Sequence, residues 1–172
     1  MRLAIMQPTF MPWIGYFSMM KKVDKFVLLD DVQFDRRSWQ QRNRILTKEG
    51  PIWLTVPVIK KNLRHQKINE VKILYEKDFI NSFKKTIQQN YSNSKYYLNY
   101  SSKIYSILEE RNEYLSELTI KLIFLFKEFL KIKTDVILSS TLIKSGKKEK
   151  LLLDICKHLG AKTYVSPPSS RE

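Results

Sequence analysis

The sequence predicts an α/β fold: a mostly parallel sheet built from β-α-β units, together with a β-hairpin and a helical insertion that covers the sheet. Two short apolar runs near the N-terminus are separated by residues at helical spacing, and strand and helix patterns alternate again near the C-terminus. Between them lies a long region of helical periodicity at about 76–132. Because neither internal repeats nor flexible linkers interrupt the 172 residues, we predict a single domain over 1–172.

The first predicted β-α-β unit has the usual size of roughly thirty residues. Arg2 to Met6 is a short apolar run, typical of a strand buried on both faces. Pro12 suits the start of a helix, and the apolar residues after it recur at helical spacing. Phe26 to Leu29 is the second apolar run. Such units are parallel and right-handed, so a parallel sheet is expected.

A β-hairpin is predicted after this unit. Arg44 to Thr47 and Ile52 to Val58 both contain β-branched residues, and they flank the turn-forming segment Lys48 to Pro51. We place the tip of the hairpin at Gly50. A basic loop from Lys60 to Lys67 follows it.

The remaining elements are predicted from periodicity. Val71 to Leu74 has the composition of a short strand, and three helices are expected after it. Toward the C-terminus we expect a strand at Asp135 to Leu138, a helix from Lys147 to His158 ended by Gly160, and a strand at Lys162 to Val165. The chain therefore returns to the α/β pattern of its N-terminal region.

The chain is strongly basic. It has 31 Lys and Arg against 17 Asp and Glu, a formal net charge of +14, which predicts an anionic partner. Lysines that only solvate the surface are the alternative. The sequence has no helix-turn-helix glycine, aromatic RNA-binding signature or long unbroken basic run, so nucleic acid is the less favoured partner. An anionic small molecule, such as a nucleotide-linked or lipid-linked sugar, is favoured instead.

Composition argues against several classes of protein. The apolar stretch from Leu118 to Leu130 contains charged residues and falls short of the ~20 residues of a spanning helix. The N-terminus lacks the pattern of a signal peptide, which predicts a cytoplasmic protein. Cys156 is the single cysteine, and with only His65 and His158 beside it the sequence offers no metal-ligand set. We therefore predict no metal site and expect Cys156 in the core.

Polar residues follow the first two predicted strands. Gln7 comes after the first strand, and Asp30 and Asp31 come after the second. In a parallel sheet, ligands bind outside the carboxyl ends of the strands, so these residues are predicted to line a cleft. Either carboxylate could act as a general base or bind a divalent ion. The alternative for each is a residue that caps or turns the chain after the strand.

The segment from Thr9 to Gly15 leads from the first strand into the predicted helix. Free backbone N–H groups at a helix start favour phosphate or carboxylate, and Gly15 would permit a close backbone approach. The turn is therefore a candidate anion-binding site. In the alternative, its prolines and Gly15 only shape the turn, while Phe10 and Trp13 fill the core.

Basic and amide side chains surround Trp39. They combine planar anion-binding groups, amide donors and an aromatic stacking face. The set consists of Arg36, Arg37, Gln40, Gln41, Arg42, Asn43 and Arg44. A nucleotide or nucleotide-sugar would fit this combination. If the segment is extended, alternate arginines face the same way, and a solvated strand face is the alternative. Arg42 and Arg44 would still act on one side.

Six short motifs carry a family resemblance. They are Met6-Gln7-Pro8-Thr9-Phe10, Pro12-Trp13-Ile14-Gly15-Tyr16-Phe17, Asp30-Asp31-Val32-Gln33-Phe34, Ser38-Trp39, Arg42-Asn43-Arg44-Ile45 and Trp53-Leu54-Thr55-Val56-Pro57-Val58. With a looser match at Tyr164-Val165-Ser166, the sequence resembles the WbqC-like protein family over essentially its whole length. Members usually continue beyond the position of Ser170, so the resemblance implies a chain truncated at its C-terminus.

The resemblance implies a biosynthetic role. Members occur in bacterial gene clusters for O-antigen and other surface polysaccharides, and the family has been proposed to include glycine transferases. We therefore hypothesise a transferase that adds an acyl or aminoacyl group, such as glycine, to a nucleotide-linked or lipid-linked sugar. Asp30 and Asp31 are its candidate catalytic residues. The candidate substrate-binding residues are Gln7, Pro8, Thr9, Trp13, Gly15, Tyr16, Gln33, Arg36, Trp39, Arg42, Asn43 and Arg44.

A more distant similarity is to the adenylate-forming nucleotidylyltransferases, which are Rossmann-like. Their first strand leads through a His-x-Gly-His turn into a helix, and Trp13-Ile14-Gly15-Tyr16 stands at that place here. Both histidines are absent, and with them the groups that would stabilise a transferring phosphoryl group. The similarity therefore implies nucleotide binding rather than adenylyl transfer.

The competing hypothesis is a non-catalytic basic module that binds RNA or anionic polysaccharide. It rests on the net charge of +14 and on tyrosines that lie among lysines. These are Tyr91, Tyr96, Tyr97, Tyr100 and Tyr105. Helix packing would equally account for them.

Overall fold

The computed structural model describes residues 1–60, 65–75 and 78–167, and its chain divides into two compact units. The first, called here the sheet unit, comprises Met1–Pro8, Trp13–Val32 and the chain from Lys127 onward. The second, called the hairpin unit, comprises Thr9–Pro12 and Gln33–Phe126. A single domain over 1–172 stays a prediction.

The sheet unit contains a four-stranded sheet with the strand order β5-β2-β1-β6. All three pairs of neighbours are parallel, which confirms the predicted parallel sheet. The chain adds β2 and then β5 on one side of β1, and it places β6 on the other side. This is the order of the first four strands in a doubly wound α/β fold. The strands are β1 (Arg2–Met6), β2 (Lys25–Leu28), β5 (Asp135–Leu138) and β6 (Thr163–Val165).

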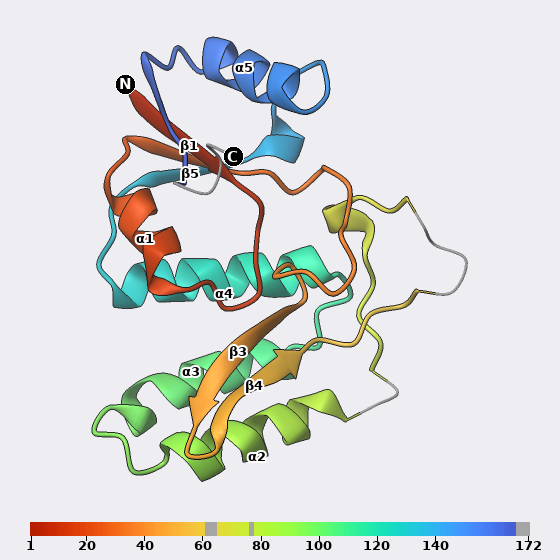
Figure 1. The fold of residues 1–172 in the computed structure, drawn as a ribbon, viewed down its shortest axis with the longest axis vertical. Helices are drawn as coiled ribbons and strands as arrows, with labels where there is room; N and C mark the ends of the chain where they lie inside the picture. Colours follow the sequence, from red (N-terminus) through yellow and green to blue (C-terminus); the bar gives the residue numbers. More distant parts are fainter. Residues whose placement is uncertain (61–64, 76–77, 168–172) are drawn as a thin grey trace. The chain divides into compact units, whose positions relative to one another are not determined.

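Helices cover both faces of this sheet (Figure 1). α1 (Ile14–Lys21) packs on the face that carries Phe26, with the ring centroids of Tyr16 and Phe26 5.2 Å apart. α5 (Glu149–His158) packs on the opposite face, to which the alternate strand residues point. The core on that face consists of Leu3, Ile5, Val27, Leu29 and Ile155. Because both faces are covered, the two central strands β1 and β2 are largely apolar and buried.

The hairpin unit combines an antiparallel hairpin with helices. β3 (Arg42–Thr47) pairs with β4 (Gly50–Thr55), which confirms the predicted hairpin. The hairpin lies beside α2 in Figure 1, and the Tyr91 hydroxyl donates to the Leu46 carbonyl at 2.8 Å. The three predicted helices are α2 (Phe79–Tyr91), α3 (Tyr97–Glu109) and α4 (Leu115–Phe129).

The predicted strand at Val71 to Leu74 was wrong. This segment forms only isolated bridges, in which Ile73 pairs with Val58 and Lys72 pairs with Tyr114. Its successive residues have partners in different parts of the chain, so no continuous ladder can build up. The composition of this segment favoured a strand, but its residues do not pair continuously with any other strand.

The hairpin boundaries also differ in detail from the prediction. The turn residues are Lys48 and Glu49, and Gly50 is the first residue of β4, with a φ of 113° that glycine tolerates best. β4 ends at Thr55 instead of reaching Val58; beyond it, Val56 N donates to the Gln41 carbonyl at 2.8 Å and Val58 forms an isolated bridge with Ile73. Within the predicted basic loop, residues 61–64 lie outside the described residues.

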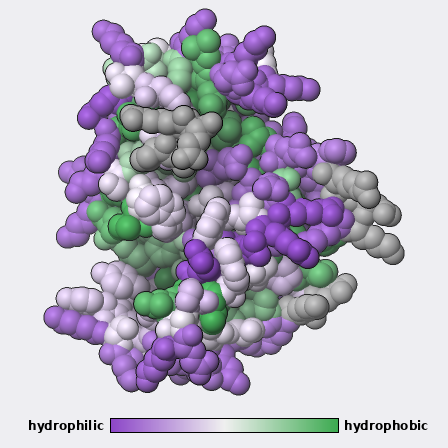
Figure 2. Space-filling view, in the orientation of Figure 1, coloured by the Kyte–Doolittle hydropathy of each residue, from purple (hydrophilic) through white to green (hydrophobic). Residues whose placement is uncertain are grey.

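Figure 2 shows hydrophilic side chains over both units in this view, in keeping with the net charge of +14. Within residues 1–60, 65–75 and 78–167, no helix has the length and apolar character needed to span a bilayer.

Candidate functional site

The carboxyl edge of the parallel sheet carries a cluster of polar side chains. Asp30 and Asp31 follow β2, and Ser139, Ser140 and Lys144 follow β5. β2 and β5 are neighbouring parallel strands whose last residues pair in register, so the segments that follow them meet at one edge. We call these five residues the strand-end cluster.

Asp30 is buried, and both of its carboxylate oxygens are bonded. Oδ1 accepts from the Ser140 backbone N–H at 2.9 Å and lies 3.1 Å from Ser139 Oγ, and Oδ2 accepts from the Ser140 hydroxyl at 2.7 Å. These bonds connect the end of β2 to η2 (Ser139–Thr141), the short 3-10 helix after β5. The Asp30 carboxylate therefore holds two strand ends together.

Asp31 pairs with Lys144. Lys144 Nζ lies 2.6 Å from Asp31 Oδ2, and the two side chains are only 9% and 19% exposed. The same ammonium donates to the Ser139 carbonyl. Ser139 Oγ lies within hydrogen-bond distance of both carboxylates, and its one proton can serve only one of them at a time. The two carboxylates thus share one hydroxyl, and the Lys144 ammonium pairs with Asp31.

The pKa of Asp31 reflects two opposing influences. Burial acts to raise the pKa of this carboxyl. Hydrogen bonds from Lys144 and Ser139, together with the charge of Lys144, outweigh burial and hold the pKa of Asp31 below its ordinary value. The carboxylate is therefore ionised throughout the neutral pH range.

A local turn completes the cluster. After β5 the chain passes through η2, where Leu142 N donates to the Ser139 carbonyl at 3.1 Å and Thr141 Oγ1 donates to the Leu138 carbonyl at 2.8 Å. The turn brings Lys144 back to the strand end. Sequence reasoning missed Ser139, Ser140 and Lys144. The available signal was the pair of serines directly after a predicted strand; what was lacking was the knowledge that β5 pairs with β2.

Gln7 follows β1 at the same edge of the sheet. It is exposed, and its carbonyl accepts a hydrogen bond from the Tyr16 hydroxyl at 3.3 Å. Tyr16 is buried, and burial raises the pKa of its hydroxyl well above the ordinary value. Gln7 also borders the point where the strand order reverses between β1 and β6, which is where doubly wound sheets bind ligands.

The Trp13 indole covers Gly15. A Cβ at Gly15 would overlap the ring, so the position requires glycine while the ring stays in place. Trp13 is 66% exposed, whereas the predicted binding residue Pro8 is buried. The candidate anion-binding turn divides between the units, because Thr9 belongs to the hairpin unit and Trp13 to the sheet unit. Its function stays a prediction.

The hairpin unit brings Trp39, Arg42 and Arg44 together with Trp53. Arg42 Cζ lies 4.1 Å from the centroid of the Trp53 ring, and Arg44 Cζ lies 5.4 Å from Trp53 and 5.8 Å from Trp39. The two indole centroids are 5.2 Å apart, with planes tilted by 43°. We call these four residues the arginine–tryptophan face. Trp53 is the member that sequence reasoning did not assign to the site.

Three other predicted binding residues contact the backbone of the hairpin unit. Asn43 Nδ2 donates to the carbonyls of Phe10 and Met11 at 3.2 and 2.6 Å. Arg36 Nη2 donates to the Lys60 carbonyl at 3.0 Å. Gln33 forms an isolated bridge with Lys67. Their role in binding substrate stays a prediction.

The five tyrosines of the competing hypothesis differ in exposure and in their contacts. The rings of Tyr96 and Tyr100 are exposed, with centroids 6.4 Å apart. The hydroxyls of Tyr97 and Tyr105 form a hydrogen bond of 3.1 Å, and the Tyr91 hydroxyl donates to the hairpin backbone.

For metals, the described part of the chain holds no group of three or more His, Cys, Asp or Glu that could bind an ion.

The strand order defines an α/β protein with a mostly parallel sheet, and polar side chains lie at the carboxyl edge of that sheet. Residues 7–172 match the WbqC-like protein family, and the chain belongs to this family. It is 34% identical over 171 residues to the uncharacterized protein Rv1507c of Mycobacterium tuberculosis (strain ATCC 25618 / H37Rv), in an alignment that covers 99% of this chain and 74% of that protein. No solved structure matches the chain, so the Rossmann-like similarity stays a prediction.

Proposed function

We propose that this protein is a transferase of surface-polysaccharide biosynthesis, which adds an acyl or aminoacyl group such as glycine to a nucleotide-linked or lipid-linked sugar. Family membership supports the biosynthetic setting. The single observation that carries the chemistry is the ion pair between Lys144 and Asp31. It keeps an ionised carboxylate at the edge where parallel sheets bind ligands.

Asp31 is the proton acceptor in the proposed reaction. A hydroxyl or amine of the sugar attacks the activated carbonyl carbon of the acyl donor. A bond forms between the nucleophile and that carbon, the bond to the leaving group breaks, and the proton of the nucleophile passes to Asp31. The carboxyl group then gives this proton to the leaving group. Such a positioned acid–base group contributes about 10²–10⁴-fold to the rate.

Lys144 is a positioning residue in this account. Its ammonium fixes the Asp31 carboxylate and lowers its pKa, which makes Asp31 a weak base toward a resting hydroxyl. As the new bond forms, the nucleophile becomes strongly acidic, and transfer to the carboxylate becomes favourable. Between the two candidate carboxylates, exposure favours Asp31, because its side chain is 19% exposed whereas Asp30 is only 3% exposed.

The charge of the strand-end cluster favours an aminoacyl donor. Two carboxylates and one ammonium leave one formal negative charge. A negative cluster attracts a substrate ammonium, such as the free amino group of a glycyl donor, and repels a phosphate. The anionic part of a sugar substrate therefore needs a different, basic surface.

The test is an assay of product mass. The protein is incubated with activated glycine and candidate nucleotide sugars, and the sugar product is searched by mass spectrometry for one added glycyl group. Asp31→Asn is compared with Asp135→Asn, which makes the same change at the exposed first residue of β5, on the opposite edge of the same sheet. Circular dichroism checks that both variants are folded.

We expect glycyl transfer by the wild type and by Asp135→Asn, and a loss of at least about 10²-fold in Asp31→Asn. Full transfer by Asp31→Asn would rule out its role as proton acceptor. Absence of transfer with every activated donor and sugar would contradict the proposed reaction as a whole.

A further inference from the structure

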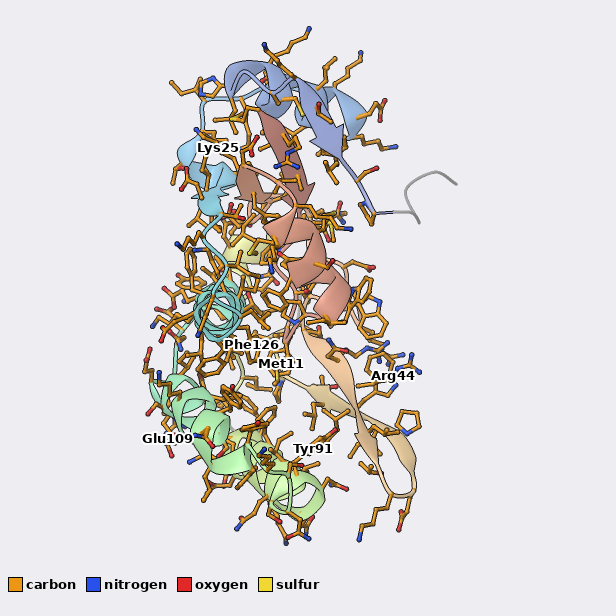
Figure 3. All side chains as sticks on the ribbon, turned by 90° about the vertical axis from the view of Figure 1, so that its left-hand side faces the viewer. Met11, Lys25, Arg44, Tyr91, Glu109 and Phe126 are labelled. Atoms are coloured by element: carbon orange, nitrogen blue, oxygen red, sulfur yellow. The ribbon has the colours of Figure 1, made fainter. Side chains whose placement is uncertain are left out.

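The arginine–tryptophan face occupies one side of the hairpin. Arg42 and Arg44 are two residues apart on β3, and Trp53 is the cross-strand partner of Arg44. Residues at alternate positions of a strand, and those directly opposite, point to the same face. The Arg44 side chain extends from the hairpin away from α2 and α3 (Figure 3). The face is therefore the outer side of the hairpin unit.

Both guanidinium groups lack an acidic partner in the described part of the chain. No Asp or Glu of residues 1–60, 65–75 and 78–167 forms an ion pair with Arg42 or Arg44. Arg42 Nε is buried there without any hydrogen-bond partner. A guanidinium offers five N–H donors in a planar fork, so the complement of this pair is an anion with several acceptor oxygens.

Two aromatic rings lie directly beside these cations. Trp39 and Trp53 remain 47% and 44% exposed although they contact each other and the guanidiniums. Exposed indole rings next to arginines form stacking surfaces for a nucleobase, and such stacking is tolerant of base identity. The face thus combines charge and planar apolar area within one side of a hairpin.

The back of the hairpin holds this face in place. Asn43, which points to the opposite side of β3, donates to the Phe10 and Met11 carbonyls. Phe10 N in turn donates to the Trp39 carbonyl at 2.9 Å. The backbone that carries Trp39 is therefore bonded to the segment that anchors β3. Such support preorganises a binding surface.

We propose that the arginine–tryptophan face binds a nucleoside diphosphate, with the diphosphate oxygens on Arg42 and Arg44 and the base against the tryptophan rings. The binding of a nucleoside diphosphate does not depend on the proposed transferase function. The further conclusion that the sugar substrate is nucleotide-linked does rest on that function. A polyprenyl diphosphate supplies the same anion without a planar group. The presence of two exposed indoles beside the arginines favours the nucleotide.

The test measures binding without any transfer reaction. UDP, GDP and inorganic diphosphate are titrated into the wild type and its variants by isothermal calorimetry. Arg44→Met and Arg42→Met remove one guanidinium each, and Trp39→Ala removes one ring. The matched control is Arg111→Met, because Arg111 also lies over an aromatic ring, 4.9 Å from the centroid of Tyr75, at another place in the hairpin unit.

We expect UDP or GDP to bind at least about tenfold more tightly than inorganic diphosphate, since stacking adds to the charge contacts. Each arginine variant should weaken the binding of all three ligands about tenfold or more, and Trp39→Ala should weaken only the binding of the two nucleotides. Arg111→Met should bind as the wild type does.

Three results would overturn the inference. They are equal affinity for the nucleotides and inorganic diphosphate, unchanged binding in all three variants of the face, and tighter binding to phosphatidylcholine vesicles that carry polyprenyl diphosphate or to single-stranded RNA than to either nucleotide. If the protein binds nucleoside diphosphates as expected but transfers no glycine, the proposed reaction fails and this inference stands.

Discussion

Lys144 and Asp31 form a 2.6 Å ion pair that is largely withdrawn from solvent, at the carboxyl edge of a parallel sheet. The lysine comes from the segment after β5, and the aspartate comes from the segment after β2. The pair therefore joins parts of the sheet unit that Gln33–Phe126 of the hairpin unit separates in the sequence. The same ion pair holds the sheet edge together and fixes the carboxylate that is the proposed proton acceptor.

Breaking this pair should destabilise the protein. Lys144→Met leaves the Asp31 carboxylate without its counter-ion, and we expect the free energy of unfolding to fall by about 1–3 kcal/mol. Lys72→Met is the matched control, because Lys72 Nζ lies at the same 2.6 Å from Glu113 but both side chains are exposed. Screening makes an exposed pair weaker, so the control should lose less. Urea denaturation measures the free energy of unfolding of both variants. An equal loss of stability in the two would contradict the role of burial.

The Asp31 carboxyl should also make stability depend on pH. Its pKa in the folded protein is lower than in the unfolded chain, where an aspartate has a pKa of about 3.9. The resulting stabilisation is present above that value and is lost as pH falls through the lower, folded pKa. The difference in unfolding free energy between wild type and Asp31→Asn should therefore be constant near neutral pH and shrink below about pH 4. If the difference in unfolding free energy grew as the pH fell, the pKa of Asp31 would be raised in the folded protein, which would contradict this account.

Gly15→Ala should displace the Trp13 indole. The added methyl group would overlap the ring, and because the ring is exposed it can move at little cost in stability. We expect acrylamide to quench Trp13 fluorescence more strongly in this variant, measured in a background where Trp39 and Trp53 are phenylalanine. Ser18→Ala, at an exposed position of α1, is the control. Unchanged quenching would show that the ring does not rest on Gly15.

Cys156 should react slowly with alkylating reagents. It packs against the core on the α5 face of the sheet, and burial raises the pKa of its thiol. Little reactive thiolate is then present at pH 7. We expect iodoacetamide to modify the folded protein much more slowly than the urea-unfolded chain, as followed by intact mass. Equal rates in the two states would place the thiol in solvent.

Much of the sheet unit could be predicted from local sequence. The central strands β1 and β2 are apolar runs because both faces are covered, and such runs stand out from their polar flanks. Asp30 and Asp31 were found for the same reason, since a carboxylate directly after a buried strand is conspicuous. Lys144 could not be found in this way, because its approach to Asp31 depends on the η2 turn and on the pairing of β5 with β2.

The hairpin face shows a second limit of sequence reasoning. Arg42 and Arg44 were expected on one side of a strand, and the register of β3 agrees. The partner of Arg44 depends on where the hairpin turns, and a tip placed at Gly50 shifts the register away from the observed turn at Lys48 and Glu49. Trp53 was not assigned to the face. An error in the position of a turn changes the cross-strand contacts.

The pH dependence of glycyl transfer tests the central claim most directly. If Asp31 accepts the proton and Lys144 holds its pKa down, the wild-type rate should fall only at acid pH, near or below the ordinary aspartate pKa of about 3.9. In Lys144→Met, burial of Asp31 is no longer opposed by the ammonium, so the acid limb of the profile should move to higher pH. An acid limb at the same pH in both proteins would contradict the account.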